Sequence, residues 1–222
     1  MTLHKALMCS AAMILAVLGS AAIAQATPIT YVETGVASGT IGGSTFTNVL
    51  VQLTAVGDTS NVLTFTDGTV VVDVNVVPMT YTIPTIGTAT ITQPTAIYAF
   101  PQPVILDPKV PELPFVVFGT LDQPPAVDGF TGLGGSGNTA LLGYDLRASI
   151  GPITGFGGIG RSPSQAVSTS LGTLNFTGDI TSPHAEGTFT ATVTPVPEPV
   201  SLVLFGSGVA ALVGRSRFRA RR

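Results

Sequence analysis

The chain is poor in charge, in cysteine and in the residues that usually bind metals. Only 9% of its 222 residues are charged, and it holds one cysteine, two histidines and no tryptophan. These shortages exclude a coiled coil, a disulfide-rich scaffold, a zinc finger and a basic nucleic-acid-binding domain. Ordinary disorder is excluded too, because 45% of the residues are hydrophobic. The length allows one medium-sized domain or two very small ones.

The first 26 residues have the pattern of a secretory signal peptide. Lys5 provides a positive start, residues 11–18 form a short apolar run, and small-x-small triplets follow it. An uncleaved membrane anchor is the alternative, but the run is short and the small residues lie where a signal peptidase cuts. We therefore expect cleavage after Ala26. Cys9 precedes the apolar run, so no lipid anchor is expected there, and the mature chain then contains no cysteine.

The end of the chain combines a proline-rich spacer, an apolar run and a basic tail. Residues 195–199 resist helix formation because three of them are proline, and the 14 residues 200–213 are uncharged. Fourteen helical residues span about 21 Å against a hydrocarbon core of about 30 Å, so residues 200–214 are expected to form a short transmembrane helix. The positive-inside rule keeps the tail cytoplasmic and the preceding domain outside. An amphipathic core helix is the alternative, but the run has no polar stripe. The tail arginines are Arg215, Arg217, Arg219, Arg221 and Arg222.

In their order, these features resemble the PEP-CTERM protein-sorting signal. The sequence Val196-Pro197-Glu198-Pro199 matches the central motif of that family, and the resemblance covers residues 196–222. It implies that Pro197, Glu198 and Pro199 are recognised by an exosortase, a membrane-embedded cysteine protease-transpeptidase that cuts near the motif. It also implies sorting to the cell surface or extracellular matrix of a Gram-negative bacterium that makes exopolysaccharide. It implies nothing about the activity of the domain between the two signals.

Residues 27–195, the cargo domain, are strongly acidic. Eleven acidic residues against three basic ones, Lys109, Arg147 and Arg161, give a formal charge of −8 with histidine neutral. A domain of this charge is not drawn to nucleic acid or to an anionic surface. Cations and cationic groups are the expected partners. No shift in composition divides the segment, so we expect one domain.

Period-two alternation dominates the cargo domain and predicts an all-β fold. The segment 188–194 alternates threonine with apolar residues, and 69–77 places four valines on one face. Such alternation gives each strand one wet and one dry face, as in antiparallel sheets, and threonine suits the wet face. We predict an antiparallel β-sandwich or jelly-roll-like domain, flanked by a signal-peptide helix and a transmembrane helix. The expected strands are 30–36, 45–55, 62–66, 69–77, 79–83, 88–92, 96–100, 115–121, 141–149, 174–180 and 188–194.

Two stretches depart from this alternation. Residues 94–125 contain eight prolines, which cannot donate to a central ladder, so edge strands or loops are expected there. Residues 129–160 contain eleven glycines and predict long mobile loops over one end of the domain.

Most candidate catalytic features have a simpler interpretation. Residues 155–161 resemble a phosphate-binding loop, but Pro163 follows where a helix would have to begin, so a plain loop is expected. His184, the one histidine of the mature chain, lies beside a proline in an expected exposed turn. Carboxylate pairs could support glycoside hydrolysis, but the chain is short of aromatic sugar platforms. The pairs are Asp122 with Asp128, Asp67 with Asp73, and Asp107 with Glu112.

Calcium is the expected metal ligand if the domain binds one. Asp58, Asn61 and Asp67 supply hard oxygen donors in predicted turns, with Asp122, Asp128 and Asn138 as further oxygens. No EF-hand spacing is present, and solvated turn residues are the alternative.

Together these patterns predict an exported structural or adhesive protein of an exopolysaccharide or biofilm matrix, without enzymatic activity or cofactor. Its expected partners are signal peptidase, an exosortase-like processing enzyme, the membrane during sorting, and exopolysaccharide, with no nucleic acid. Two alternatives stay open. The cargo could be a secreted carbohydrate-binding module or hydrolase, or the tail could remain uncut and anchor a periplasmic domain.

Overall fold

The computed structural model describes residues 27–67, 70–104, 113–121, 130–162, 166–177 and 186–195. The regular structure of these residues consists of strands and two single-turn 3-10 helices, which confirms the all-β prediction. The elements are β1 (Pro28–Ile41), β2 (Ser44–Asp58), η1 (Thr59–Asn61), β3 (Leu63–Asp67), β4 (Val70–Val76), β5 (Met79–Ile83), β6 (Gly87–Thr90), β7 (Thr95–Val104), β8 (Leu113–Leu121), β9 (Phe130–Gly137), η3 (Thr139–Leu141), β10 (Ile150–Ser162), β11 (Val167–Thr169), β12 (Gly172–Phe176) and β13 (Glu186–Val193).

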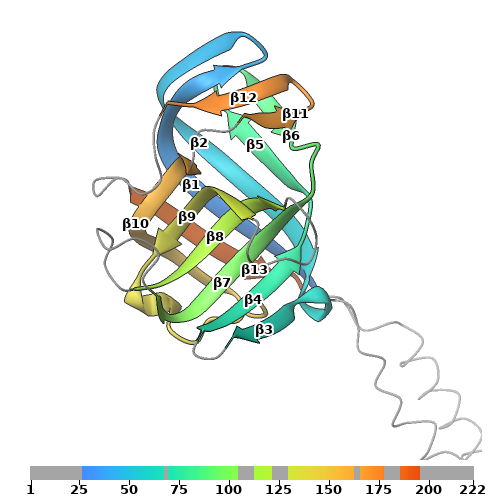
Figure 1. The fold of residues 1–222 in the computed structure, drawn as a ribbon, viewed down its shortest axis with the longest axis vertical. Helices are drawn as coiled ribbons and strands as arrows, with labels where there is room; N and C mark the ends of the chain where they lie inside the picture. The colour runs from blue at the N-terminus through green and yellow to red at the C-terminus, as the bar shows by residue number, and fades with distance from the viewer. Residues whose placement is uncertain are drawn as a thin grey trace, which may run out of the picture.

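The strands pair antiparallel within one large sheet. Its order is β3-β4-β7-β8-β9-β10-β13-β1-β2-β5-β6. Strand β12 pairs with the far end of β1, and β11 pairs with β12. The sheet curls over, so that β7, β8 and β9 lie in front of β1, β2 and β13 (Figure 1). The two facing halves enclose the core between them, as the layers of a sandwich do.

One hydrogen bond shows how tightly the sheet curls. The Ser136 hydroxyl on β9 donates to Glu33 Oε1 on β1 at 2.8 Å, although β10 and β13 lie between these strands in the sheet. In a flat sheet, strands three places apart would be separated by about 14 Å. The sheet must therefore bend sharply across β9, β10 and β13.

Alternation along the strands builds the main core. In β5, Met79, Tyr81 and Ile83 are buried, while the threonines between them are only partly covered. Across the core, the rings of Phe118 on β8 and Phe189 on β13 meet edge to face with centroids 6.1 Å apart. Contacts of this kind join the two halves of the sheet into one packed interior.

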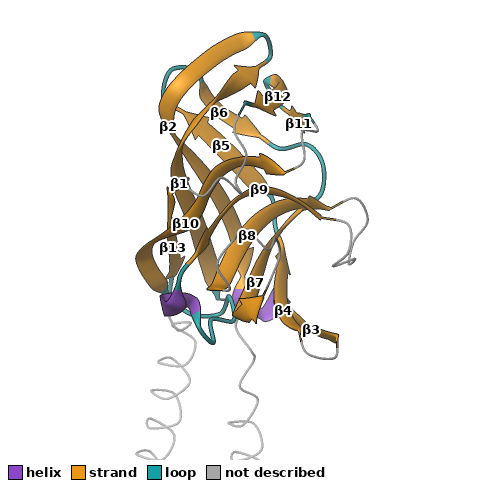
Figure 2. Cartoon of the chain, turned by 60° about the vertical axis from the view of Figure 1, so that its left-hand side comes forward, coloured by secondary structure: helices purple, strands orange, loops and turns teal. Residues whose placement is uncertain are grey.

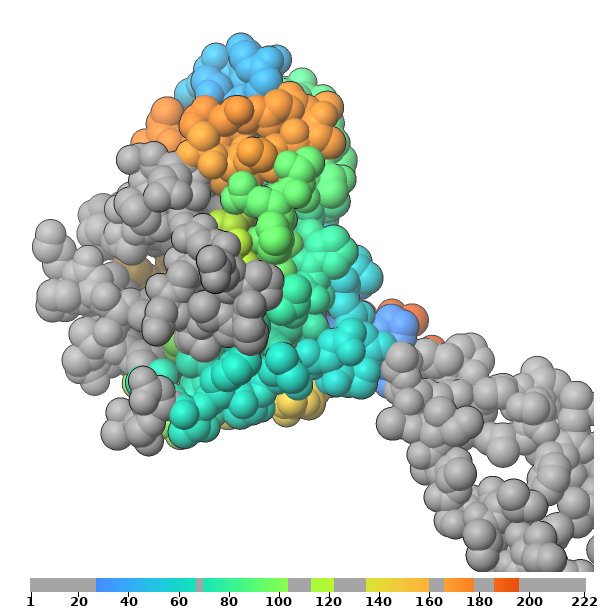
Figure 3. Space-filling model, turned by 45° about the vertical axis from the view of Figure 1, so that its right-hand side comes forward, coloured from blue at the N-terminus to red at the C-terminus, as the bar shows by residue number. Residues whose placement is uncertain are grey.

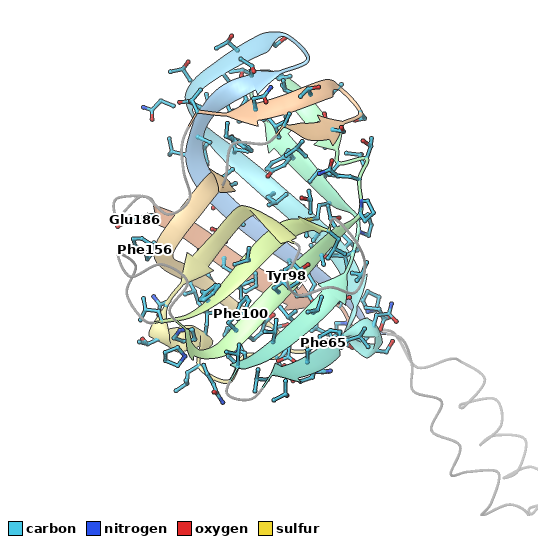
Figure 4. The ribbon with its side chains drawn as sticks, viewed as in Figure 1. Phe65, Tyr98, Phe100, Phe156 and Glu186 are labelled. Carbon is cyan, nitrogen blue, oxygen red and sulfur yellow. The ribbon has the colours of Figure 1, made fainter. Side chains whose placement is uncertain are left out.

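Strands β4, β7 and β8 are buried on both faces. Ile97 and Ala99 of β7 belong to the main core, whereas Tyr98 and Phe100, which point the other way, belong to a second cluster on the outer face. Phe100 stacks on Phe115 with a centroid distance of 4.5 Å. Figure 4 labels Phe65 on β3 and Tyr98 and Phe100 on β7, two strands of this side that are separated by β4. Burial on both faces explains the continuous apolar runs of β7 and β8.

The prediction of edge strands or loops for residues 94–125 is wrong for β7 and β8. Both lie inside the sheet, between β4 and β9. Their prolines are tolerated because Pro101, Pro103 and Pro114 fall where the β7–β8 register shifts between Phe100 and Val104. A proline at such an irregularity interrupts no regular ladder hydrogen bond.

The prediction of loops for residues 129–160 is wrong for β9 and β10, which include residues 155–161, whereas residues 138–149 between them do form a turn and a loop. Most of these glycines lie in β9 and β10, two central strands. A Cβ atom on Gly155 would lie 2.4 Å from the carbonyl oxygen of Gly137, so this backbone approach requires glycine. The bend of the sheet thus explains a composition that resembles a loop.

The strand predicted at residues 141–149 is a helical turn followed by a loop. Asn138 caps η3 by accepting from the Ala140 amide at 2.8 Å, and the buried side chains of Leu141, Tyr144 and Leu146 close one end of the core. These three residues are apolar because they cover one end of the core, and not because they belong to a strand.

The start of β1 and the end of β13 lie side by side. The Thr194 amide donates to the Pro28 carbonyl at 2.9 Å, and the closing loop 138–149 touches the same end through a bond from the Val193 amide to Ser149 Oγ. Both ends of the domain therefore emerge beside the 3-10 helices (Figure 2). The β1–β2 hairpin and β11–β12 form the opposite end (Figure 3).

Candidate functional site

The residues of the predicted sorting signal lie outside the described part of the chain. This holds for Pro197, Glu198 and Pro199, for the five tail arginines and for the predicted signal peptide, residues 1–26. Their roles remain predictions. Among the described residues, no helix combines the length and hydropathy needed to cross a membrane.

The calcium candidates are spread along the chain from the end of β2 to the end of β3. Asp58 caps η1, where its Oδ1 accepts from the Ser60 amide at 2.7 Å and from the Ser60 hydroxyl at 2.6 Å. These bonds hold the pKa of Asp58 below its ordinary value. Asn61 is exposed at the end of η1, and Asp67 lies beyond it, at the far end of β3. Within the described ranges, no three His, Cys, Asp or Glu side chains form a metal-binding group.

The other predicted features divide between strand and undescribed segments. Residues 155–161 belong to β10, so they form no phosphate-binding loop. His184 and the pairs Asp122 with Asp128 and Asp107 with Glu112 lie outside the described residues. Asp73, the partner considered for Asp67, is 3% exposed and points into the domain.

Asp73 belongs to a polar cluster that fastens the closing loop. Arg147 of this loop lies 3.7 Å from Asp73 Oδ1 and 3.5 Å from Asp145 Oδ2, and its Nη2 donates to the Val62 carbonyl at 2.9 Å. The Thr64 hydroxyl donates to Asp73 as well. The cluster thus joins β3, β4 and the closing loop.

The same end holds a buried tyrosine bond. The Tyr31 hydroxyl donates to the Leu146 carbonyl at 2.7 Å and accepts from Asn75 Nδ2 at 3.1 Å. Burial raises the pKa of Tyr31 to about 12, so the phenol stays protonated and can keep donating. This contact orients the loop and gives no reactive group.

Glu33 is the most perturbed carboxyl of the described chain. Its side chain is fully buried, Oε1 accepts from Ser136, and Oε2 has no hydrogen-bond partner. Burial raises its pKa to about 8, only partly offset by the Ser136 bond. Such a carboxyl could exchange protons near neutral pH, but a fully buried group has no contact with a substrate.

Threonines form rows across the outer face of six strands. The register places Thr34 beside Thr188 on one side and Gln52 on the other, and the row continues in both directions. A second row runs parallel two residues away. The first row is Thr154, Thr188, Thr34, Gln52, Thr82 and Thr88; the second is Thr190, Val32, Thr54, Thr80 and Thr90.

We call these residues, with Thr30, Val36, Leu50, Val56 and Thr192 on the same strand faces, the threonine face. All its side chains are exposed or half-buried, and none carries a charge. Neighbouring hydroxyls pair: Thr82 and Thr88 oxygens are 3.0 Å apart, and those of Thr154 and Thr188 are 3.1 Å apart. Four of its strands, β10, β13, β1 and β2, lie next to one another in Figure 2. Glu186 lies at its rim beside Phe156 (Figure 4).

Sequence reasoning found the parts of this surface but not the whole. Alternation at 88–92 and 188–194 predicted threonines on wet faces, but the register that joins six strands depends on pairings between distant segments. Glu33 was missed although a signal existed, since it shares the parity of Ile29 and Tyr31, which face the core.

Comparison with known proteins adds no assignment to this geometry. No protein-family model, no curated protein and no solved structure matches the chain.

Proposed function

We propose that the chain is an exported, surface-sorted structural or adhesive protein of an extracellular matrix, with the threonine face as its contact surface. The observation that carries the proposal is this uncharged, hydroxyl-rich face across six strands. We also propose that the cargo domain has a sandwich or jelly-roll-like architecture, and that a signal-peptide helix precedes it and a transmembrane helix follows it.

The chemistry of the face suits a matrix of neutral, hydroxyl-rich polymer. Each threonine offers a hydroxyl that donates and accepts, beside a methyl group that needs no partner. Single contacts of this kind are weak, but many identical ones add up when several sites engage together. Exopolysaccharide is the polymer we propose as partner, and the protein needs no enzymatic step for this role.

Processing at both ends would bring the domain to the surface. Signal peptidase removes residues 1–26, and an exosortase-like enzyme cuts near Pro197, Glu198 and Pro199. The helix over 200–214 holds the chain in the membrane until then, and the arginines of 215–222 keep its end in the cytoplasm. These residues are acted upon and perform no chemistry themselves.

Intact mass spectrometry of the protein from its own cells, fraction by fraction, tests the proposal. A surface or medium species that starts at Thr27 and ends near Glu198 is the expected result. Glu198→Ala should leave export intact but retain the precursor in the membrane, whereas the control Glu186→Ala, an exposed carboxyl of the cargo, should be processed normally. A membrane species that still ends at Arg222 would instead indicate a permanent anchor and remove the support for surface sorting.

A further inference from the structure

We propose that two copies of the protein associate face to face through the threonine face. The inference rests on the proposed function, because it names a second copy as a partner of that contact surface. It adds a homotypic contact to the proposed polymer contact. The arrangement would resemble two sheets of a sandwich, packed about 10 Å apart with strands about 30° from parallel.

The first argument is that a hydroxyl array is complementary to itself. A carboxylate accepts only and an ammonium donates only, so a face of either kind repels its own copy. A threonine hydroxyl does both, as the Thr82–Thr88 and Thr154–Thr188 pairs on this face already demonstrate. A second copy therefore presents the donors and acceptors that the first requires, in the same row spacing.

Charge is the second argument. The cargo domain carries a formal charge of −8, so two copies repel one another over most orientations. The threonine face contains no charged residue, and the acidic residues of matching parity, Glu186 and Asp58, begin β13 and end β2 at its rim. Face-to-face approach thus keeps these two carboxylates of each copy toward the periphery.

Three exposed apolar side chains on this face provide the third argument. Val36 and Leu50 lie directly opposite each other on β1 and β2 and are 59% and 60% exposed, and Val56 is 53% exposed. Association would cover this apolar area, which water otherwise surrounds, and would provide a driving force beyond the hydroxyl contacts.

The size of the face sets the expected affinity. The face has 16 residues. At about 4.8 Å by 6.7 Å for each, they cover roughly 500 Å² per copy, or roughly 1,000 Å² in a dimer. This value lies at the lower end of specific interfaces, so the expected contact is weak and reversible. Higher salt should strengthen it, because salt screens the repulsion between two acidic domains.

Sedimentation velocity over a wide concentration range tests the proposal. The protein is used as its cells release it, or in detergent micelles if it stays in the membrane, and variants are compared within one preparation. Gln52→Glu puts one negative charge in the middle of the face and should raise the dimer dissociation constant about tenfold or more. Gln102→Glu is the matched control, because Gln102 is also exposed but lies on β7, away from the face.

A chemical measurement provides an independent test. The mature chain is expected to lack cysteine, so Gln52→Cys and Gln102→Cys each introduce one thiol. Maleimide labelling at Gln52→Cys should slow as protein concentration rises, while labelling at Gln102→Cys should not. The proposal is overturned if the wild-type protein stays monomeric up to millimolar concentration, or if the two positions behave alike in both experiments.

Failure of this proposal can be told apart from failure of the proposed function. If the tail is uncut, the measured mass contradicts surface sorting. The comparison of the Gln52 and Gln102 variants still tests whether two copies associate through the threonine face. If Gln52→Glu releases the protein from the matrix while the wild-type protein is monomeric, the face binds polymer and not a second copy. That outcome overturns the homotypic contact and retains the adhesive function.

Discussion

At the residue scale, Glu33 should make stability depend on pH. Burial raises its pKa to about 8 from an ordinary 4.5, so between these values the folded protein keeps a proton that the unfolded chain has lost. The free energy of unfolding should therefore fall as pH rises from about 4.5 to about 8, by about 1.4 kcal/mol per pH unit. Glu33→Gln removes this ionisation and should flatten the curve in urea unfolding measured at several pH values.

The matched control for this prediction is Glu186→Gln, which neutralises an exposed carboxyl. It should leave in place the fall in stability that we assign to Glu33. Parallel stability curves for the wild-type protein and Glu33→Gln would contradict the assignment of this proton to Glu33.

Single residues show where sequence reasoning reaches its limit. Parity along 29–33 was available from the sequence and places Glu33 with Ile29 and Tyr31, on the core side. Its partner Ser136 was not available, because that contact depends on the curl of the sheet across two intervening strands. The sequence can thus indicate that a carboxyl is buried, but it does not indicate which group donates a hydrogen bond to it.

At the element scale, Gly155 should be indispensable to the bend of the sheet. A Cβ atom on Gly155 would lie 2.4 Å from the Gly137 carbonyl oxygen, so Gly155→Ala must displace backbone. We expect a loss of about 1–3 kcal/mol or more in the free energy of unfolding. Gly137→Ala is the control, because its Cβ would be 3.4 Å from the closest atom, an ordinary contact. Equal effects of both substitutions would show that the bend tolerates a side chain at Gly155.

The closing loop should loosen when Arg147 is removed. Arg147→Ala deletes the bond to the Val62 carbonyl and leaves the buried Asp73 without a cation, so we expect a loss of about 1–3 kcal/mol. Amide hydrogen exchange should rise within 138–149 but not in β13. Arg147→Lys keeps the charge and should recover part of the loss; full recovery would mean that the contact with Val62 contributes nothing.

The elements that sequence predicted best are those with one wet face. Strands β1, β2, β5 and β13 alternate because threonine faces water and apolar residues face the core. Strand β10 was not predicted, because its glycines permit a close backbone approach but add no apolar residue to the alternation pattern. The loop after Asn138 was mistaken for a strand because Leu141, Tyr144 and Leu146 are apolar for a different reason, the closure of one end.

At the scale of the whole molecule, the position of the two chain ends determines how the domain would be oriented on a membrane that holds the tail. Thr27 and Pro195 emerge beside the closing loop 138–149, because the Thr194 amide bonds to the Pro28 carbonyl. If the tail is held in a membrane, this end faces the membrane and the β1–β2 hairpin points away. The spacer over 195–199 reaches only about 15 Å in an extended proline-rich conformation, so the domain stays close to the bilayer.

This orientation predicts unequal access at two exposed positions. Ser44 lies at the β1–β2 hairpin and Ala148 in the closing loop, and each can be changed to cysteine in a chain whose mature part is expected to have none. With the chain that lacks residues 1–26 but keeps its tail, inserted in lipid vesicles, a maleimide carrying a large polymer should label Ala148→Cys several-fold more slowly than Ser44→Cys. The two rates should converge on protein released from the membrane, where nothing lies beside the closing loop. An unchanged ratio of rates in vesicles and in solution would mean that the spacer lets the domain turn freely, and that the ends of the chain do not set its orientation.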